Sequence, residues 1–104
     1  MRVMEGYREK VLRTFKELRA ALEQLDSDAG IRISGSFAEF DGGGFIFISK
    51  AEEGFIVNIC DSVKDGSGVF IPGEREKWLN LKNVAEVMNF ILKTAKRPLK
   101  AYLY

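Results

Sequence analysis

The sequence predicts a single α+β domain over residues 1–104, an antiparallel meander of four to five strands flanked by an N-terminal and a C-terminal amphipathic helix. Three observations lead to this fold class. Apolar residues recur every three to four positions near both ends of the chain, and they alternate with other residues in the middle. Glycine-containing turns separate the alternating segments. A chain of 104 residues also has the size of one typical domain.

The first predicted helix spans residues 4–25. Its apolar residues are spaced by threes and fours and form one narrow stripe. The stripe consists of Met4, Tyr7, Val11, Phe15, Leu18, Leu22 and Leu25. We expect this stripe to lie across the sheet of the same chain, and the alternative is a seam between the helices of two copies. Residues 26–30 then form a turn.

The alternating segment begins with a predicted strand over residues 31–40. Asp41 and three glycines follow and predict a tight turn over residues 41–44, which would place Phe40 opposite Phe45. Only an odd number of residues in this turn would exchange the two faces of the sheet, because successive side chains of a strand point to opposite sides.

A second predicted turn, at residues 51–54, places Lys50 opposite Phe55. The two turns together divide the side chains between two faces. One is the isoleucine face, which holds Ile31, Ile33, Phe37, Ile46, Ile48, Phe55, Val57 and Ile59. The other is the phenylalanine face, which holds Arg32, Ser34, Ser36, Ala38, Phe40, Phe45, Phe47, Ser49, Ile56, Asn58 and Cys60. We expect the helices to cover the isoleucine face, because it is almost wholly apolar.

The second half of the chain is less regular. Residues 61–68 predict a loop, and residues 69–71 predict a short fourth strand that stops at Pro72. Residues 73–81 fit either a helical turn or a fifth strand, so that Trp78 has no predicted position.

The second predicted helix begins after Asn83, which can cap it together with Glu86 three residues later. Its apolar stripe runs to Ala95, and Pro98 closes it. Residues 99–104 alternate again, which predicts a final edge strand or an arm.

The composition excludes several classes of site. The chain has one cysteine and no histidine, so it lacks the ligands of a structural zinc site and the base of a histidine-dependent mechanism. We predict no metal, no cofactor, no catalytic residues and no enzymatic activity. The run Asp41-Gly-Gly-Gly shares only its glycines with a phosphate-binding loop. Cys60 lies in an apolar strand, which predicts a buried thiol.

No apolar stretch approaches the roughly 18 residues that a membrane span requires, and we predict a cytoplasmic protein without membrane contact. The net charge is +1, but the charges are distributed unevenly. Residues 1–22 carry six basic and three acidic groups, residues 23–65 carry three and nine, and residues 66–104 carry seven and three. An anionic partner would therefore be attracted by the basic helix and tail, because the sheet segment alone would repel it.

Aromatic side chains on a sheet face, with basic residues nearby, are typical of proteins that bind single-stranded nucleic acid. Bases stack on the rings, and lysine and arginine contact the phosphates. We predict stacking on the three phenylalanines, hydrogen bonding by Asn58 and phosphate contacts by the basic residues. The predicted site residues are Arg32, Phe40, Phe45, Phe47, Lys50, Asn58, Lys93, Lys96, Arg97 and Lys100.

Two other functions remain open at this point. The aromatic face is also suited to an oligomer interface, as in a structural or protein–protein interaction module. A small-molecule-binding regulatory domain is the third and weaker alternative.

The order of elements resembles two groups of single-stranded DNA-binding proteins, the archaeal ThermoDBP group and the family of the transcriptional coactivator positive cofactor four. In the coactivator family, a strand is followed by a tryptophan-bearing segment and an amphipathic helix. Gly68-Val69-Phe70-Ile71-Pro72, then Glu76-Lys77-Trp78, then residues 81–93 are similar to that arrangement. The resemblance covers about residues 31–97 for this family and nearly the whole chain for the ThermoDBP group. It implies sequence-tolerant binding of single strands by an oligomer, with DNA favoured over RNA, and we expect a homodimer.

Overall fold

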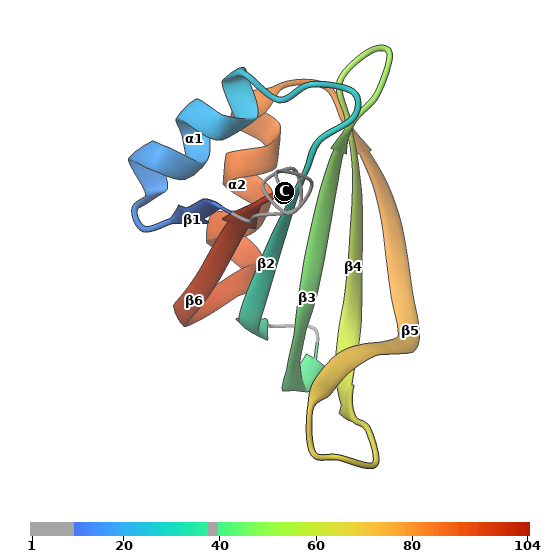
Figure 1. Ribbon diagram of the computed structural model, residues 1–104. Coiled ribbons are helices and arrows are strands. Elements are labelled where there is room, and N and C mark those ends of the chain that lie inside the picture. Colours follow the sequence, from blue (N-terminus) through green and yellow to red (C-terminus); the bar gives the residue numbers. More distant parts are fainter. Residues whose placement is uncertain (1–9, 38–39) are drawn as a thin grey trace, which may run out of the picture.

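The computed structural model describes residues 10–37 and 40–104, and within β3 and β6 the side chains of residues 40–42 and 96–99 are outside the described set. The described elements are β1 (Lys10–Leu12), α1 (Phe15–Glu23), β2 (Gly30–Phe37), β3 (Phe40–Lys50), β4 (Phe55–Lys64), β5 (Phe70–Leu81), α2 (Val84–Thr94) and β6 (Ala95–Leu103). The strands form one sheet in the order β1-β6-β2-β3-β4-β5, and every neighbouring pair is antiparallel (Figure 1).

The predicted α+β class with an antiparallel sheet is confirmed, but the predicted strand count is wrong. The described residues form six strands rather than four to five. β6 lies between β1 and β2, so the C-terminal segment is an interior strand and neither an edge strand nor an arm. This placement depends on pairing between segments about 70 residues apart in the chain, such as Ile33 with Ala101, which local patterns do not encode.

α1 begins at Phe15, later than the sequence indicated. Residues 4–9 of the predicted helix are outside the described residues, and residues 10–12 form β1, which pairs with β6. Thr14 caps the helix, because its Oγ1 accepts a hydrogen bond from the Glu17 amide at 3.0 Å. The Glu17 carboxylate accepts one from the Arg13 amide at 2.7 Å.

α2 begins where the sequence predicts. Asn83 Oδ1 accepts a hydrogen bond from the Glu86 amide at 2.9 Å, and Glu86 Oε1 accepts one from the Lys82 amide at 2.8 Å. The helix ends at Thr94 and the chain enters β6 at Ala95, so Pro98 lies within β6 and does not itself close the helix.

Both helices pack on the isoleucine face, and Figure 1 shows them on the same side of the sheet. Leu18 and Leu22 of α1 and Ile91 of α2 are buried there against the strands. The strand residues without exposed surface are Ile31, Ile33, Ile46, Ile48, Val57 and Ile59. Full burial of such a side chain contributes about 1.5–3 kcal/mol, so this layer provides most of the hydrophobic stabilisation.

The predicted register between β2 and β3 is wrong, although the described side chains of Phe45, Ile46, Phe47 and Ile48 lie on the predicted faces. Phe45 lies opposite Ser34 rather than Phe40, and Phe40 lies opposite Phe37. The glycines of residues 42–44 therefore belong to β3 and not to a turn. Because the partner of Phe45 changes from residue 40 to residue 34, an even number of positions, Phe45 keeps its predicted face. Phe40 instead pairs with Phe37, which belongs to the isoleucine face, so this register does not support the predicted grouping of Phe40 with Phe45.

β5 is a single long edge strand that continues through Pro72 and residues 73–81. Opposite Asp61 the strand bulges, since Cys60 pairs with Glu76 whereas Ser62 pairs with Pro72. The Asp61 carboxylate accepts hydrogen bonds from the Arg75 amide at 3.1 Å and from Arg75 Nε at 3.2 Å.

Gly73 leaves room for the Asp61 carboxylate at this bulge, because a Cβ atom there would displace it. Figure 1 shows that β5 bends in its first half, and the tip of the β4–β5 hairpin extends beyond the rest of the sheet. In the described part of the chain, no helix combines the length and apolarity needed to cross a membrane.

Candidate nucleic-acid interface

The phenylalanine face of the sheet carries no helix among the described residues, because α1 and α2 both pack on the other side. The strand register aligns five of its side chains in one row across the sheet. The row consists of Tyr102 on β6, Arg32 on β2, Phe47 on β3, Asn58 on β4 and Trp78 on β5. Neighbouring strands lie about 4.8 Å apart, so the three aromatic residues follow one another at about 10 Å. We call this set the aromatic row.

The rings of the aromatic row differ in exposure. Trp78 is 65% exposed, whereas Phe47 and Tyr102 are half-buried. Phe45, two residues before Phe47 on β3, is on the same face and stacks beside it. The ring centroids are 6.0 Å apart and the interplanar angle is 21°. The Arg32 guanidinium lies 4.8 Å from the centre of the Tyr102 ring, a cation–π arrangement.

Asn58 is the buried polar member of the row. Its Nδ2 donates a hydrogen bond to Glu76 Oε1 at 2.8 Å, so part of its hydrogen-bonding capacity is used within the protein. Cys60, two positions along β4, is buried as predicted. Burial and then the nearby carboxylates of Asp61 and Glu76 raise the pKa of the Cys60 thiol, which therefore stays protonated at neutral pH.

An open groove of about 730 Å³ lies on the same face, beside the aromatic row. We call it the β2–β6 groove. Its described lining is Arg32, Ser34, Gly35, Ser36, Gly43, Gly44, Phe45, Ser62, Val69, Phe70, Lys100 and Tyr102. Two of these residues are basic and none is acidic.

Three glycines, Gly35, Gly43 and Gly44, line the base of the β2–β6 groove and place no side chain in it. Gly43 has φ of +93°, a conformation that L side chains rarely adopt, and a Cβ atom there would lie 3.0 Å from the Gly35 carbonyl oxygen and 3.7 Å from Ser62 Oγ. Because Gly35, Gly43 and Gly44 line this region, main chain replaces side chains at its base.

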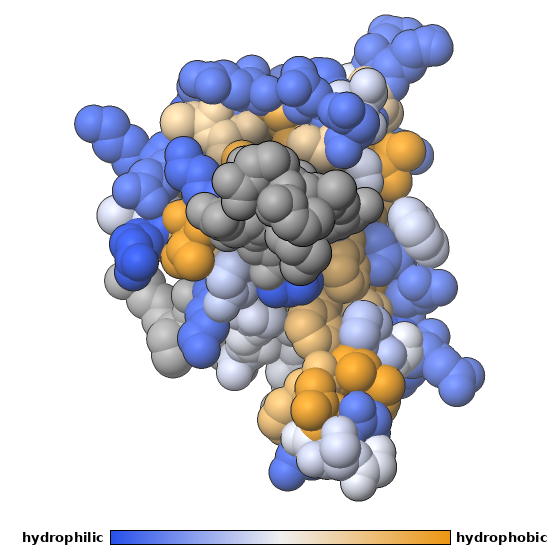
Figure 2. Space-filling model, viewed as in Figure 1, coloured by the Kyte–Doolittle hydropathy of each residue, from blue (hydrophilic) through white to orange (hydrophobic). Residues whose placement is uncertain are grey.

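The far wall of the groove is the tip of the β4–β5 hairpin. Exposed apolar side chains gather there, as Figure 2 shows at the lower end of the molecule: Val63, Val69, Phe70 and Ile71. Lys64 Nζ lies 5.4 Å from the centre of the Phe70 ring.

Asp65 orders the turn at this tip. Its Oδ1 accepts hydrogen bonds from the Ser67 amide and hydroxyl, both at 2.7 Å, and from the Val69 amide at 3.0 Å. These bonds, the Ser67 side chain first, hold the pKa of Asp65 below its ordinary value.

The structure brings some of the predicted basic residues to this face and separates others from it. Lys100 lies opposite Ser34 and lines the groove beside Arg32. Lys50 instead pairs with Phe55 at the end of the isoleucine face, with its Nζ 4.6 Å from the Phe55 ring centre. Lys93 is on α2, on the helix-covered side of the sheet.

Three predicted residues have side chains outside the described set. Lys96 and Arg97 are in β6, and the main chain of Lys96 pairs with that of Ser36. Phe40 is in β3, and its main chain pairs with that of Phe37, a core residue.

Sequence reasoning missed Trp78, Tyr102 and Phe70 as members of this face. A signal for Trp78 was available, since Trp78 and Asn80 alternate with Leu79 and Leu81 as the residues of a half-buried strand do. This signal was obscured because the charged residues 74–77, next to the bulge opposite Asp61, interrupt the apolar alternation of β5.

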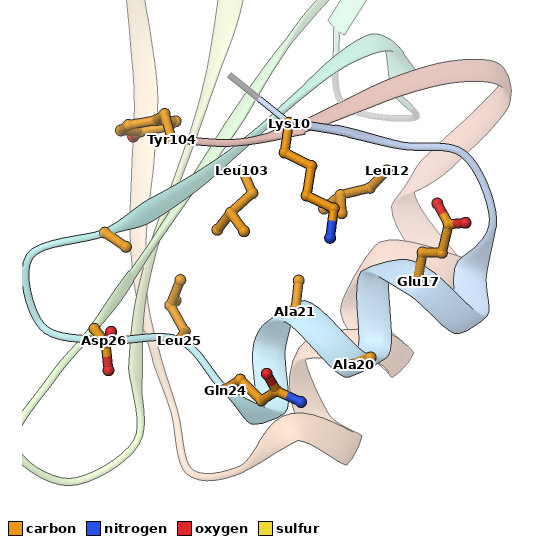
Figure 3. Close-up of a pocket in the computed structure, with 11 residues that line it drawn as sticks. Lys10, Leu12, Glu17, Ala20, Ala21, Gln24, Leu25, Asp26, Leu103 and Tyr104 are labelled. Atoms are coloured by element: carbon orange, nitrogen blue, oxygen red, sulfur yellow. The ribbon is translucent and has the colours of Figure 1, made fainter. Parts of the chain in front are cut away.

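A second cavity, of about 490 Å³, lies on the helix-covered side between α1 and the strands β1 and β6. Its apolar lining includes Leu12, Ala21 and Leu103, and Figure 3 shows the Lys10 side chain pointing from β1 into this space. The cavity contains none of the predicted site residues.

Comparison of the chain with models of protein families, with curated proteins and with solved structures finds no match. Among residues 10–37 and 40–104, no group of three acidic or cysteine side chains is arranged to hold a metal ion.

Proposed function

We propose that the protein binds single-stranded nucleic acid, DNA in preference to RNA, on its phenylalanine face and with little dependence on sequence. The observation that carries this proposal is the aromatic row, which crosses a sheet face that no described helix covers. The preference for DNA follows from the resemblance to single-stranded DNA-binding proteins.

The spacing of the rings supports stacking. The rings of the aromatic row follow one another across the sheet at about 10 Å, in the order Tyr102, Phe47 and Trp78. Phe45 stacks beside Phe47 and extends the aromatic surface at the centre of the sheet. A base that stacks on an aromatic side chain contributes about 1–3 kcal/mol, and any base can stack. Asn58 lies between Phe47 and Trp78, and its partly buried hydrogen bond to Glu76 links β4 to β5.

The distribution of charge supports a phosphate path on the β2–β6 side of this face. Arg32 and Lys100 line the groove there, and Lys64 lies beside Phe70 at its far wall. Two acids of the acidic middle segment are engaged within the protein, Asp61 by Arg75 and Asp65 by the hairpin turn. Glu76 lies at the β5 end of the face, so the phosphates would avoid that end.

The experiment that tests the proposal compares two exposed apolar residues on opposite sides of the sheet. Trp78 is 65% exposed on the phenylalanine face, and Leu92 is 56% exposed on α2. We expect Trp78→Ala to weaken the binding of labelled oligodeoxythymidine at low salt by about fivefold or more, the equivalent of one stacked base. Leu92→Ala should leave the affinity unchanged. Equal affinities for the two variants would refute the stacking role of the face.

A second candidate function is a homodimer interface on the same face. It is favoured by the exposed apolar side chains at the hairpin tip, because contiguous apolar patches mark interaction sites. Light scattering separates the two candidates. If Trp78→Ala and Phe70→Ala convert a dimer to a monomer and leave nucleic-acid affinity unchanged, the face is an interface and the proposal of nucleic-acid binding fails.

A further inference from the structure

The β2–β6 groove differs from the rest of the phenylalanine face, because it has walls on two sides. The aromatic row crosses the whole sheet, whereas the groove lies between the β2–β6 part of the sheet and the hairpin tip and shares Arg32 and Tyr102 with the row. Its volume of about 730 Å³ falls in the range of small-molecule sites, roughly 300–1,000 Å³.

The lining of the groove combines three kinds of chemical group. Aromatic rings line it from three strands, Phe45 from β3, Tyr102 from β6 and Phe70 from the β5 part of the hairpin tip. Ser34, Ser36 and Ser62 provide hydroxyl groups that both donate and accept hydrogen bonds. Arg32 and Lys100 provide positive charge at the β6 side, and no described lining residue is acidic.

A nucleotide presents the complementary groups. Its base has an aromatic face and a hydrogen-bonding edge, and its phosphate is an anion that lysine and arginine bind. A plain apolar ligand would match only the rings of this lining, and a simple anion would match only its positive charge.

We propose that the β2–β6 groove is a site for one nucleotide, with its base between Phe45 and Phe70 and its phosphate at Lys100 and Arg32. The inference rests on the proposed function where the nucleotide is one unit of a bound strand. A free nucleoside monophosphate is the other source of the same chemistry. The groove would thus bind one base both by hydrogen bonds to its edge and by stacking on its face, whereas the other bases of a strand would stack on the aromatic row.

The hairpin is held in the position that this role requires. The Asp61–Arg75 contacts fix the bulge at which β5 turns, and the Asp65 hydrogen bonds fix the turn that carries Val69. The wall that contains Phe70 is therefore attached at both ends of the tip by defined side-chain contacts.

The test is an NMR titration of the full chain with deoxyadenosine monophosphate, run in parallel with an oligodeoxythymidine binding assay. We expect saturable shifts of the Gly43, Gly44 and Ser62 amides with the mononucleotide. Phe70→Ala should weaken mononucleotide binding by about fivefold or more, since it removes one stacking wall. Ile71→Ala is the matched control, because Ile71 is also exposed at the tip but does not line the groove.

Two further variants separate the parts of the site. Trp78→Ala should weaken strand binding and leave mononucleotide binding within about twofold, because Trp78 is in the aromatic row and does not line the groove. Lys100→Gln should reduce the affinity for deoxyadenosine monophosphate towards that for deoxyadenosine, which has no phosphate. Phe70 and Lys100 are exposed, so both variants should retain the fold, and the same spectra confirm it.

The outcomes distinguish the groove from the proposed function. Shifts at the groove without strand binding would support the nucleotide site and refute binding of single strands. Strand binding without saturable mononucleotide shifts would overturn the nucleotide site and leave the proposed function standing. Equal mononucleotide affinities for Phe70→Ala and Ile71→Ala would also overturn it.

Discussion

The two faces of the sheet are built from the same strands and have opposite properties. On β3, Ile46 and Ile48 have no exposed surface, whereas their neighbours Phe45 and Phe47 are half-buried on the other side. The isoleucine face packs against both helices, and the phenylalanine face carries rings, hydroxyls and cations without a described helix over them. The apolar core therefore lies on the isoleucine face, and the exposed side chains of the phenylalanine face can vary without loss of that core.

The largest expected difference between the two faces is in the free energy of unfolding. Ile48→Ala should lower it by about 2–5 kcal/mol, because the substitution leaves a cavity in the core. Trp78→Ala should change it by no more than about 0.5 kcal/mol, since Trp78 is mostly exposed. Urea denaturation of the two variants gives both values. A comparable loss from Trp78→Ala would mean that the phenylalanine face is part of the core.

A smaller difference concerns the salt dependence of binding. Lys100 lies on the phenylalanine face and Lys93 lies on α2, across the sheet. Lys100→Gln should reduce the slope of log affinity against log salt by about 0.7 to 1, the contribution of one phosphate contact. Lys93→Gln should leave the slope unchanged. A reduced slope for Lys93→Gln together with an unchanged slope for Lys100→Gln would contradict this prediction and would indicate that phosphates contact the helix-covered side.

The smallest expected effect is at the hairpin tip and depends on pH. The pKa of Asp65 is lowered in the folded protein by the bonds from Ser67 and Val69. Their stabilisation is present above the ordinary aspartate pKa and is lost as the pH falls through the lowered value.

An NMR titration towards acid pH should therefore show a step in the Val69 amide resonance below the pH at which an ordinary aspartate titrates. The same step should be absent in Asp65→Ala. A step that persists in this variant would show that Asp65 does not order the turn.

Sequence patterns predicted the faces of the sheet because alternation is a local property. They could not give the register of β2 and β3, since Asp41 and the glycines fit a turn as well as a strand that approaches other main chain closely. The position of β1 was also hidden, because the helical stripe continues through Val11 and only the Thr14 cap separates the two elements.

The candidate site was predicted in part for the same reason. Phe45, Phe47 and Arg32 follow from alternation within neighbouring strands. Trp78 depends on the bulge at Asp61, and Tyr102 on the long-range pairing of β6 with β2, which no local pattern specifies. Lys50 and Lys93 were predicted as phosphate contacts because they are basic, and the structure places both on the side of the isoleucine face.

Trp78 provides the most direct test, because it is the single tryptophan of the chain and is exposed in the aromatic row. The measurement is the intrinsic fluorescence of the unmodified protein during titration with unlabelled oligodeoxythymidine at low salt. Stacking of bases on this face predicts saturable quenching of Trp78 emission that raised salt reverses. Emission that stays unchanged throughout the titration, after correction for absorption by the added strand, would contradict the account.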